Sequence, residues 1–359
     1  MRCALLGRTL LTAIVATPAS WTTAAAEDAR ITLDEVAPGV FAALQPHERR
    51  FDDANTLVVA CAEWGALLVD PPSDRARLQA LVDEIRRRGW QVAEVVSSHW
   101  HSDHTQGTAA IVEAFGSGID RIGHETLTQD VPDRAAAAHH ERVALYEREI
   151  PAARDRLARR VRRDGSPLAA EDVPAASAAI DQAAAWLADN RDARFLSPTT
   201  TYATRLVLER CGRRIELVHF RAHTRGDTVV RLPAEGVVAT GDLLDDLPYV
   251  GHGHPRSWVA TLDEIDGWDT RVFVPGHGPL LRSEDKLQVV RGFLRDLVAA
   301  TDAAHARGAS SQQAGEGIDL ERWRAALAAG DETAERFFDQ TIDEAVARAF
   351  DELSEDGSR

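Results

Sequence analysis

The chain has 359 residues, 44% hydrophobic and 27% charged, so it can bury a sizeable core and is neither disordered nor collagen-like. Its 57 acidic and 41 basic residues give a formal charge of -16. This acidic balance argues against nucleic acid or an anionic membrane surface as a partner and leaves a small-molecule substrate as the expectation. Length alone allows either two domains or one large layered domain.

Residues 1–26 have the order of a secretory signal peptide. Two arginines precede an apolar stretch at 10–16, and three alanines end the segment at 24–26. The apolar stretch is shorter than the roughly 20 residues that a bilayer-spanning helix needs. We therefore expect cleavage after Ala26, a periplasmic or secreted protein, and no stable membrane span after cleavage.

Three cysteines are present, and Cys3 lies inside the predicted signal. Export would place Cys61 and Cys211 in an oxidising compartment, where they either pair or remain two separately buried thiols. Both alternatives stay open, because the sequence does not supply the Cα distance that a disulfide requires.

Strand-like and helical segments then alternate along the chain. Short β-rich runs at 30–70, separated by Pro, Gly and Asp, predict an antiparallel meander. An amphipathic helix is predicted at 74–89, a buried strand at 92–97, a helix at 105–115 and a further strand at 119–123. This alternation is typical of an α/β architecture.

The composition changes in the middle of the chain, becoming rich in Ala, Arg and Glu. Helical runs at 133–163 and 175–190, separated by Gly165-Ser166-Pro167, predict an inserted αα-hairpin that acts as a lid or an interaction arm. Strand-like character then returns in five predicted strands, at 206–208, 215–220, 228–232, 237–239 and 271–274.

The chain turns helical again from Ser283 onward and ends in an amphipathic stretch at 320–353. Large apolar side chains in this region need burial; they are Trp323, Phe337, Phe338 and Phe350. We expect a docked helical extension, with a dimerisation helix, and so a homo-oligomer, as the alternative.

The strongest chemical signal is a run of polar residues directly after the strand predicted at 92–97. His99, His101, Asp103 and His104 fall within six positions. Imidazole and carboxylate are the ligands that borderline divalent metals prefer. Open α/β sheets bind ligands in loops at the carboxyl ends of their strands, so this run predicts a metal site.

With this run at its centre, the chain resembles the metallo-β-lactamase fold superfamily. Five motifs carry the resemblance: Asp70 after Ala66-Leu67-Leu68-Val69; His99, His101, Asp103 and His104; His223 in Ala222-His223-Thr224-Arg225-Gly226-Asp227; Asp242 in Thr240-Gly241-Asp242; and His277 in Pro275-Gly276-His277-Gly278. It covers residues 40–280 apart from the helical insertion.

The resemblance implies an α/β fold, a four-layer αββα sandwich carrying the inserted helical hairpin and the C-terminal helical extension. The domains expected on this basis are a signal peptide at 1–26, a metallo-β-lactamase-like domain at 27–300 with its insertion at 126–196, and the extension at 301–359.

The resemblance also implies two metal ions, expected to be Zn²⁺ with iron or manganese as alternatives. The implied ligands are His99, His101 and His223 for one ion, Asp103, His104 and His277 for the other, and Asp242 bridging both. The implied nucleophile is a hydroxide held between the two ions. Catalytic roles are expected for Asp103 as a proton carrier and for Asp70 as the residue that orients the metal loop.

Residues 249–255 follow Asp242 closely enough to form a pocket wall. We expect Tyr249 to be a candidate catalytic donor to an oxyanion, with His254 as a further candidate for substrate contact and a surface turn as the alternative. Trp100 either packs beneath the metal loop or faces the substrate. Asp227 is a candidate for fixing a ligand histidine.

The expected function is an exported binuclear hydrolase of a small ester, thioester, lactone or lactam. One alternative is a β-lactamase proper, of the type without a cysteine ligand, because Asp242 stands where sulfur would be needed. Another is an iron-dependent sulfur oxidoreductase resembling persulfide dioxygenases. The last is a non-catalytic metal-binding protein on the same scaffold.

Overall fold

The computed structural model describes residues 31–356, so the predicted signal peptide lies outside the described residues. The described chain forms two compact units. We call residues 31–134 and 195–356 the core unit, and residues 135–194 the hairpin unit.

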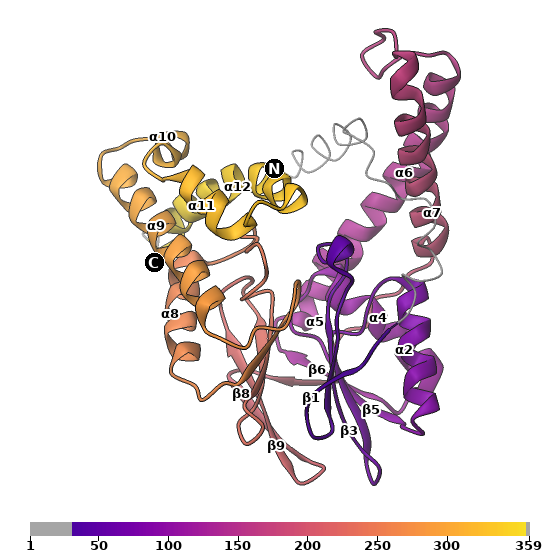
Figure 1. The fold of residues 1–359 in the computed structure, drawn as a ribbon, viewed down its shortest axis with the longest axis vertical. Helices are drawn as coiled ribbons and strands as arrows, with labels where there is room; N and C mark the ends of the chain where they lie inside the picture. The colour runs from indigo at the N-terminus through magenta and orange to yellow at the C-terminus, as the bar shows by residue number, and fades with distance from the viewer. Residues whose placement is uncertain (1–30, 357–359) are drawn as a thin grey trace. The chain divides into compact units, whose positions relative to one another are not determined.

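The first sheet of the core unit has seven strands, drawn in indigo to magenta in Figure 1. In spatial order they are β1 (Asp34–Ala37), β2 (Val40–Ala43), β3 (Thr56–Cys61), β4 (Gly65–Val69), β5 (Val92–Val96), β6 (Asp120–His124) and β7 (Thr200–Tyr202). The first four strands pair antiparallel, as the predicted meander requires, and β4 to β7 pair parallel. β4 is buried along its whole length, which explains its continuous apolar sequence.

The second sheet has five strands, and all come from the second half of the chain. Their spatial order is β12 (Val272–Pro275), β11 (Val237–Gly241), β10 (Asp227–Leu232), β9 (Arg213–Phe220) and β8 (Arg205–Arg210). Only β11 and β12 pair parallel in this sheet. Apolar side chains of both sheets, among them Leu57, Leu67, Ile215 and Val230, form one core between the two layers.

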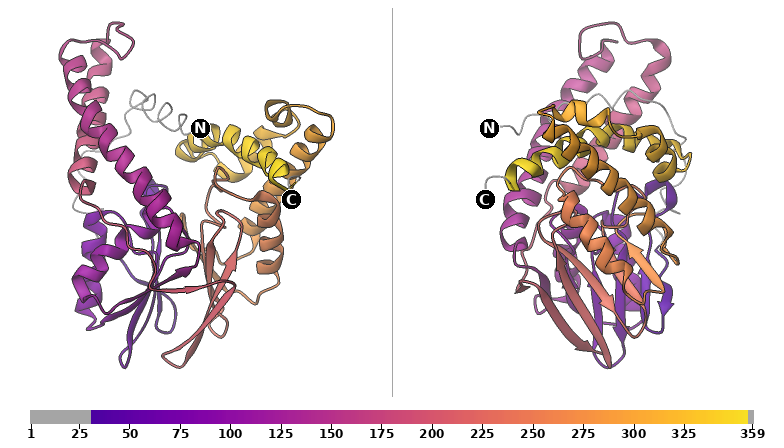
Figure 2. Two further views of the ribbon diagram at one scale, coloured as in Figure 1. Left: turned by 180° about the vertical axis from the view of Figure 1, so that it is seen from behind. Right: turned by 90° about the vertical axis from the view of Figure 1, so that its left-hand side faces the viewer.

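Helices cover the outer face of each sheet (Figures 1 and 2). α2 (Arg75–Arg87) and α4 (Gly107–Phe115) bury Leu81, Ile85 and Ile111 against the first sheet. α8 (Pro255–Asp266) and α9 (Asp285–Ala306) bury a second set against the other sheet, including Trp258. The order helix, sheet, sheet, helix is the predicted αββα sandwich.

The helix predicted at 105–115 is divided in the structure. A single turn, α3 (Ser102–Thr105), precedes α4, so Asp103 and His104 lie on a helix and not in a loop. Gly107 begins α4 where the backbone carbonyls of Pro71 and Pro72 approach closely, and a Cβ at this position would overlap them. The metal run is therefore packed directly against the segment that follows Asp70.

The C-terminal helices belong to the same compact unit as the sandwich. After α9 come α10 (Ser311–Gly315), α11 (Leu320–Ala328) and α12 (Glu332–Asp356). Trp323 and Phe338 are buried in the core beside α9, and Phe337 and Phe350 pack against it. The apolar side chains of the extension are thus covered within the chain; self-association through these helices stays a prediction.

The hairpin unit consists of two antiparallel helices, α6 (Ala137–Ala158) and α7 (Val173–Asn190). They pack through a small cluster of Ile150, Ile180 and Leu187. α6 ends before residue 163, the predicted end, and the chain after it turns through Arg160 at a positive φ of 55°. Val131–Ala136, where the first run was predicted to begin, is a π-helical turn.

Cys61 and Cys211 form a disulfide with their Cα atoms 5.8 Å apart. Cys61 ends β3 in the first sheet, and Cys211 follows β8 in the second sheet. The bond therefore joins the two sheets, and it resolves the alternatives that the sequence left open.

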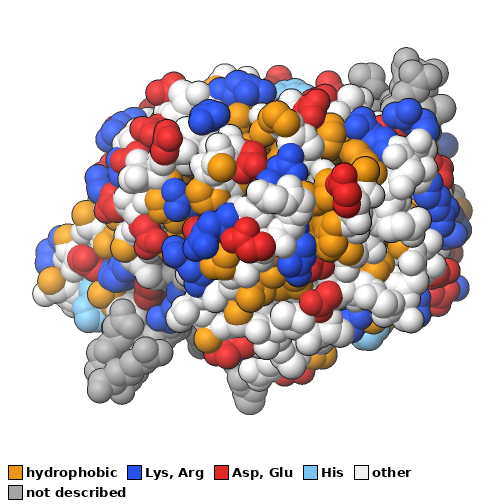
Figure 3. Space-filling view, turned by 90° about the horizontal axis from the view of Figure 1, so that it is seen from below, with side chains coloured by type: hydrophobic (Ala, Val, Ile, Leu, Met, Phe, Trp, Pro, Cys, Tyr) orange, Lys and Arg blue, Asp and Glu red, His pale blue; other side chains and the backbone are white. Residues whose placement is uncertain are grey.

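The surface seen from below carries apolar side chains interspersed with charges of both signs (Figure 3). On this face side chains of the two charge signs are intermixed. Within residues 31–356, every helix is too short or too polar to cross a membrane.

Candidate metal centre

The seven predicted ligands converge at one end of the core unit, and each follows a strand. β5 leads into His99, His101, Asp103 and His104; the β9–β10 connection carries His223; Asp242 directly follows β11; and β12 leads into His277. Buried strands thus hold the ligand backbone in place, while the connections between them present the side chains.

Three histidines and one carboxylate form the first ligand group. The ligand atoms of His99, His101, His223 and Asp242 all lie within 4.8 Å of one another. His223 Nε2 is 3.2 Å from His101 Nδ1 and 3.4 Å from Asp242 Oδ2. His99 Nε2 lies 3.5 Å from the same carboxylate oxygen. This donor set suits zinc and related divalent ions.

Asp103, His104 and His277 form the second ligand group. Asp103 Oδ2 lies 3.1 Å from His277 Nε2 and 3.4 Å from His104 Nε2. Asp242 reaches this group through its other oxygen, since Oδ1 is 3.0 Å from His104 Nε2. Its two oxygens therefore face different groups, as a bridging ligand requires.

The unpartnered atoms of the site fit a metal. His99 Nε2, His104 Nε2 and Asp242 Oδ1 are buried and make no hydrogen bond within the described residues. Buried polar atoms without partners are costly, and a cation would satisfy all three. These three atoms face the two ligand groups, while His223 Nδ1, on the far side of its ring, is also buried without a hydrogen bond to another described residue.

The opposite ring nitrogens of three of the candidate ligand histidines are held by protein atoms. His99 Nδ1 lies 3.0 Å from Ser98 Oγ, and His277 Nδ1 lies 2.9 Å from the Arg50 carbonyl oxygen. His104 Nδ1 lies 2.8 Å from Asp70 Oδ2. Metal-ligating histidines usually donate their second nitrogen in this way, which fixes both tautomer and ring orientation.

Asp70 orients the metal run from two directions. Its Oδ2 accepts from His104, and its Oδ1 accepts from the Ser98 backbone N–H at 2.7 Å. Asp70 has a positive φ of 52°, a conformation that Asp adopts more readily than most residues. The side chain is buried, so its negative charge acts directly on the second ligand group.

The electrostatics of the second group also favour a cation. Burial lowers the pKa of His277, but Asp242, Asp245 and Asp103 outweigh it and raise that pKa to about 10. For His104, burial is likewise outweighed by Asp242, Asp103 and Asp70, and its pKa is raised well above the ordinary value. The carboxylates thus give this group an excess of negative charge, which a divalent ion would neutralise.

His99 and His101 show the opposite electrostatics. Burial, together with the neighbouring histidines, lowers the pKa of both rings well below the ordinary value. Both rings are therefore neutral at physiological pH, which is the state that coordinates a metal.

A glycine allows the bridging carboxylate to approach its neighbours. A Cβ at Gly276 would overlap Asp242 Oδ1 and would lie 3.0 Å from the His104 ring. The Pro-Gly-His-Gly motif therefore has a steric role in addition to supplying His277.

The segment after Asp242 forms a wall beside the first ligand group. The Tyr249 ring centre is 6.1 Å from that of His223, and the Glu344 carboxyl group lies near its hydroxyl. His254 is buried at the start of α8, and its Nδ1 lies 3.2 Å from Arg348 Nη2. Its ring is thus engaged with α12.

Trp100 packs beside the His101 ring, and Asp227 holds the backbone around His223. Trp100 is buried, its ring centre 4.4 Å from that of His101. Asp227 accepts from the backbone N–H groups of Ala222 and Thr224, so it shapes the turn around His223 without contacting the ring.

Two contributors were not predicted as site residues. His252 Nδ1 lies 2.8 Å from His101 Nε2. Asp245 Oδ1 accepts the His277 backbone N–H at 2.9 Å and, with Asp242 and His277, completes another set of metal-ligating groups. Their nearness to Asp242 in the sequence was the available signal, but no spacing rule distinguishes them from residues of an ordinary loop.

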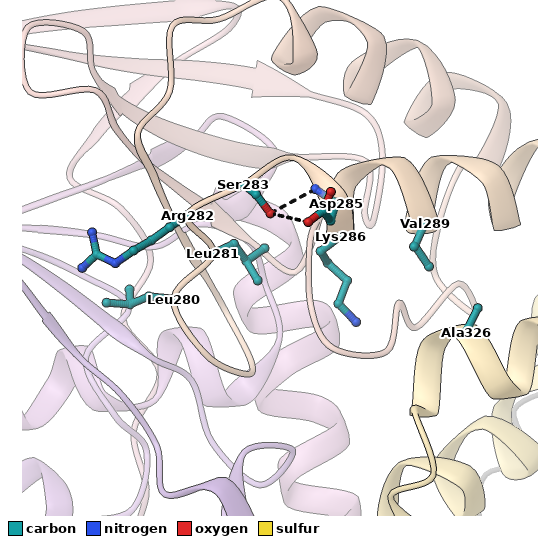
Figure 4. Close-up of a pocket in the computed structure, with 8 residues that line it drawn as sticks. All are labelled: Leu280, Leu281, Arg282, Ser283, Asp285, Lys286, Val289 and Ala326. Atoms are coloured by element: carbon teal, nitrogen blue, oxygen red, sulfur yellow. Dashed lines mark hydrogen bonds between the residues drawn. The ribbon is translucent and has the colours of Figure 1, made fainter.

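A hollow of about 370 Å³ lies elsewhere in the core unit and contains none of the predicted site residues (Figure 4). It is lined by Leu280, Leu281, Arg282, Ser283, Asp285, Lys286, Val289 and Ala326. Two of its polar side chains bond to protein atoms: Ser283 Oγ donates to Asp285, and Lys286 Nζ donates to the Asp246 carbonyl.

No protein-family model matches the chain. A linear primary-alkylsulfatase from a Pseudomonas species is 24% identical over 251 residues, which are 66% of this chain and 44% of that protein. A hydroxyacylglutathione hydrolase from a Polaromonas species is 38% identical over 62 residues, 17% of this chain and 22% of that protein. The chain thus spans less than half the length of these relatives.

Among solved structures, a double mutant of a sec-alkyl sulfatase superposes with a TM-score of 0.57 at 15% identity, covering 80% of this chain and 45% of that one. The two packed sheets, the outer helices and this likeness identify the chain as a protein of the metallo-β-lactamase fold. Its curated relatives, an alkylsulfatase and hydroxyacylglutathione hydrolases, are hydrolases of that superfamily.

Proposed function

We propose that the chain is an exported hydrolase that uses two divalent metal ions, zinc in the first instance, to cleave a small ester, thioester, lactone or lactam. The convergence of seven candidate ligands, with the outer ring nitrogens of His99, His104 and His277 held by protein atoms, carries the proposal. Two bound cations would supply an activated water at neutral pH and would polarise the scissile bond.

Asp103 is placed to carry a proton between water and leaving group. Burial opposes its ionisation, but His104 and His277 hold its pKa well below the ordinary value, so it is an anion at neutral pH. Its side chain is 25% exposed, so a substrate that approaches from solvent could reach it.

Tyr249 is the candidate donor to an oxyanion that develops on the substrate. Burial and the Glu344 carboxyl group raise the pKa of its hydroxyl, which therefore stays protonated at neutral pH. A neutral phenol beside the first ligand group can donate a hydrogen bond as charge develops.

A second candidate substrate is an alkyl sulfate ester. The alkylsulfatase aligns with two thirds of this chain, the longer of the two alignments reported above. Burial lowers the pKa of His252, and His223, Arg134 and Arg348 lower it further. The two guanidinium groups thus place positive charge beside the first ligand group. An anionic substrate would be attracted there despite the acidic balance of the whole chain.

Export is supported by two features. The N-terminal sequence has the order of a signal peptide, and the disulfide between Cys61 and Cys211 suits an oxidising compartment. Fractionation of cells that express the full chain tests this part: the mature protein should start at residue 27 and lie outside the cytoplasm.

The proposed activity is tested with protein stripped by a chelator and reloaded with zinc. A lactam, a lactone, a thioester, an alkyl sulfate and a phosphodiester form the panel. We expect hydrolysis of at least one of the first four substrates that disappears with the metal and returns with zinc. A zinc-loaded protein inactive on all of them would contradict the proposal.

Metal analysis separates the alternatives. One equivalent of iron with persulfide oxidation would support the sulfur oxidoreductase, and hydrolysis of the lactam alone would support a β-lactamase proper. Two tightly bound ions with no turnover would favour a non-catalytic metal-binding protein.

A further inference from the structure

We infer that His252 is the hydrogen-bond partner that sets the orientation and tautomer of His101, and that helix α12 holds His252 in place. Retention of the first metal ion would then depend on the C-terminal helix. This inference rests on the metal centre of the proposed function and concerns residues outside the five motifs.

The two ring nitrogens of His101 face different groups. Nδ1 lies 3.2 Å from His223 Nε2, toward the first ligand group, and Nε2 lies 2.8 Å from His252 Nδ1. A His101 that ligates through Nδ1 carries its proton on Nε2 and donates it to His252. His252 therefore does for His101 what Asp70 does for His104.

The remaining histidine of the first group faces the same segment. The His223 ring centre lies 6.1 Å from that of Tyr249. His252 also packs against its surroundings, with ring centres 5.0 Å from Trp100 and 5.3 Å from Tyr249. Residues 249–254 thus form the outer support of two first-group ligands.

This segment is held by α12 through several polar contacts. Arg348 Nε donates to the Gly253 carbonyl at 2.7 Å, directly after His252. Glu352 Oε2 accepts the Arg256 backbone N–H at 3.3 Å. On the other side of His252, the Glu344 carboxyl group lies against Gly251, where a Cβ would be 2.7 Å from it.

Buried residues take part in these contacts, so water competes less for the hydrogen bonds. Gly253 and His254 are buried, as is Glu352, whose side chain is only 3% exposed. The segment also packs on the sandwich, since the His254 backbone N–H donates to the Ala222 carbonyl beside His223, with 2.6 Å between the nitrogen and the oxygen. A substitution in α12 that displaces this segment would therefore alter the contact between His101 Nε2 and His252.

The test measures zinc affinity by competition with a chromophoric chelator, using the full mature chain. His252→Ala should weaken binding of one zinc equivalent by roughly 10–100-fold and leave the other unchanged. Arg348→Ala should weaken the same equivalent by a smaller factor. His252→Asn, whose amide oxygen can still accept from His101, should recover part of the loss and guards against misfolding of the alanine variant.

Two variants serve as matched controls. His140→Ala removes an exposed imidazole from the hairpin unit, and Arg336→Ala removes another arginine of α12. Neither should change zinc affinity. Wild-type affinity for both equivalents in His252→Ala, or in Arg348→Ala, would overturn the inference. The readout needs no substrate, so failure of this inference is distinct from failure to find hydrolysis.

Discussion

The two halves of the metal centre are supported by different parts of the chain. The second group is held from within the sandwich, by Asp70 after β4 and by the Arg50 carbonyl beside His277. The first group contacts residues 249–254, and Arg348 of α12 donates a hydrogen bond to this segment. The second group thus rests on Asp70 and Arg50, of which Arg50 also pairs with Asp331 just before α12 at 3.1 Å. The first group rests on a segment that Arg348 of α12 contacts directly.

This difference shows what the extension contributes. Its helices bury Trp323 and Phe338 against α9, so they are part of the core. Arg348 and Glu352 then connect that packing to the wall of the site. We expect the packing of the extension to be coupled to the first metal ion more strongly than to the second.

The largest effect is expected for Asp242→Ala, because this residue serves both halves. Its two oxygens face different ligand groups, so its loss should lower zinc content below two ions per chain. Bound metal ions stabilise the transition state by several kcal/mol, so kcat for hydrolysis should fall by about 10³-fold or more. Metal analysis and kcat measure both effects. Asp263→Ala, on the surface of α8, is the control, and two retained zinc ions in Asp242→Ala would contradict the bridging role.

Tyr249→Phe tests the wall of the first group without changing a ligand. The ring is retained and only the hydroxyl is lost, so zinc content should stay at two ions. If the hydroxyl donates to an oxyanion, kcat should fall by about 10²-fold. An unchanged kcat would show that the hydroxyl serves only its contact with Glu344.

Asp70→Asn tests the second half of the comparison. Asn tolerates the positive φ of 52° at this position, so the backbone is kept while the charge facing His104 is removed. One zinc equivalent should bind roughly 10–100-fold more weakly. Cadmium-113 resonances can assign the loss: it should fall on the group containing His104, and a loss at the group of three histidines would contradict the division of support.

The smallest effect on the metal centre is expected for the double variant Cys61→Ser with Cys211→Ser. The disulfide lies at the far end of β3 from Thr56, whose Oγ1 donates to the Asp70 carbonyl. Zinc affinity should be unchanged, while the free energy of unfolding should fall by about 2–5 kcal/mol. Denaturant unfolding of the disulfide-bonded wild type and of the double variant measures this difference. Equal free energies of unfolding would show that the bond contributes nothing to stability.

The sequence predicted most of what local pattern determines. Apolar runs predicted buried strands such as β4 and β5, and the spacing of His99, His101, Asp103 and His104 predicted a cluster of possible metal ligands, which the structure contains. The seven ligands belong to motifs whose residues follow strands, so their convergence could be expected from the resemblance.

The parts that could not be predicted depend on long-range packing. The contact between His252 and His101 joins residues 151 positions apart, and the one between Arg348 and Gly253 joins residues 95 apart. The disulfide likewise spans 150 residues. The helical turn α3 was missed because a polar run of four residues has no hydrophobic period from which a helix could be inferred.

A stepwise zinc titration of the metal-free mature chain tests the central claim most directly. Hydrolysis of the responsive substrate is measured at each addition. Two zinc ions should bind per chain, and activity should rise with their binding and vanish on chelation. Binding of a single ion, or activity that persists in the stripped protein, would contradict a binuclear metal-dependent hydrolase.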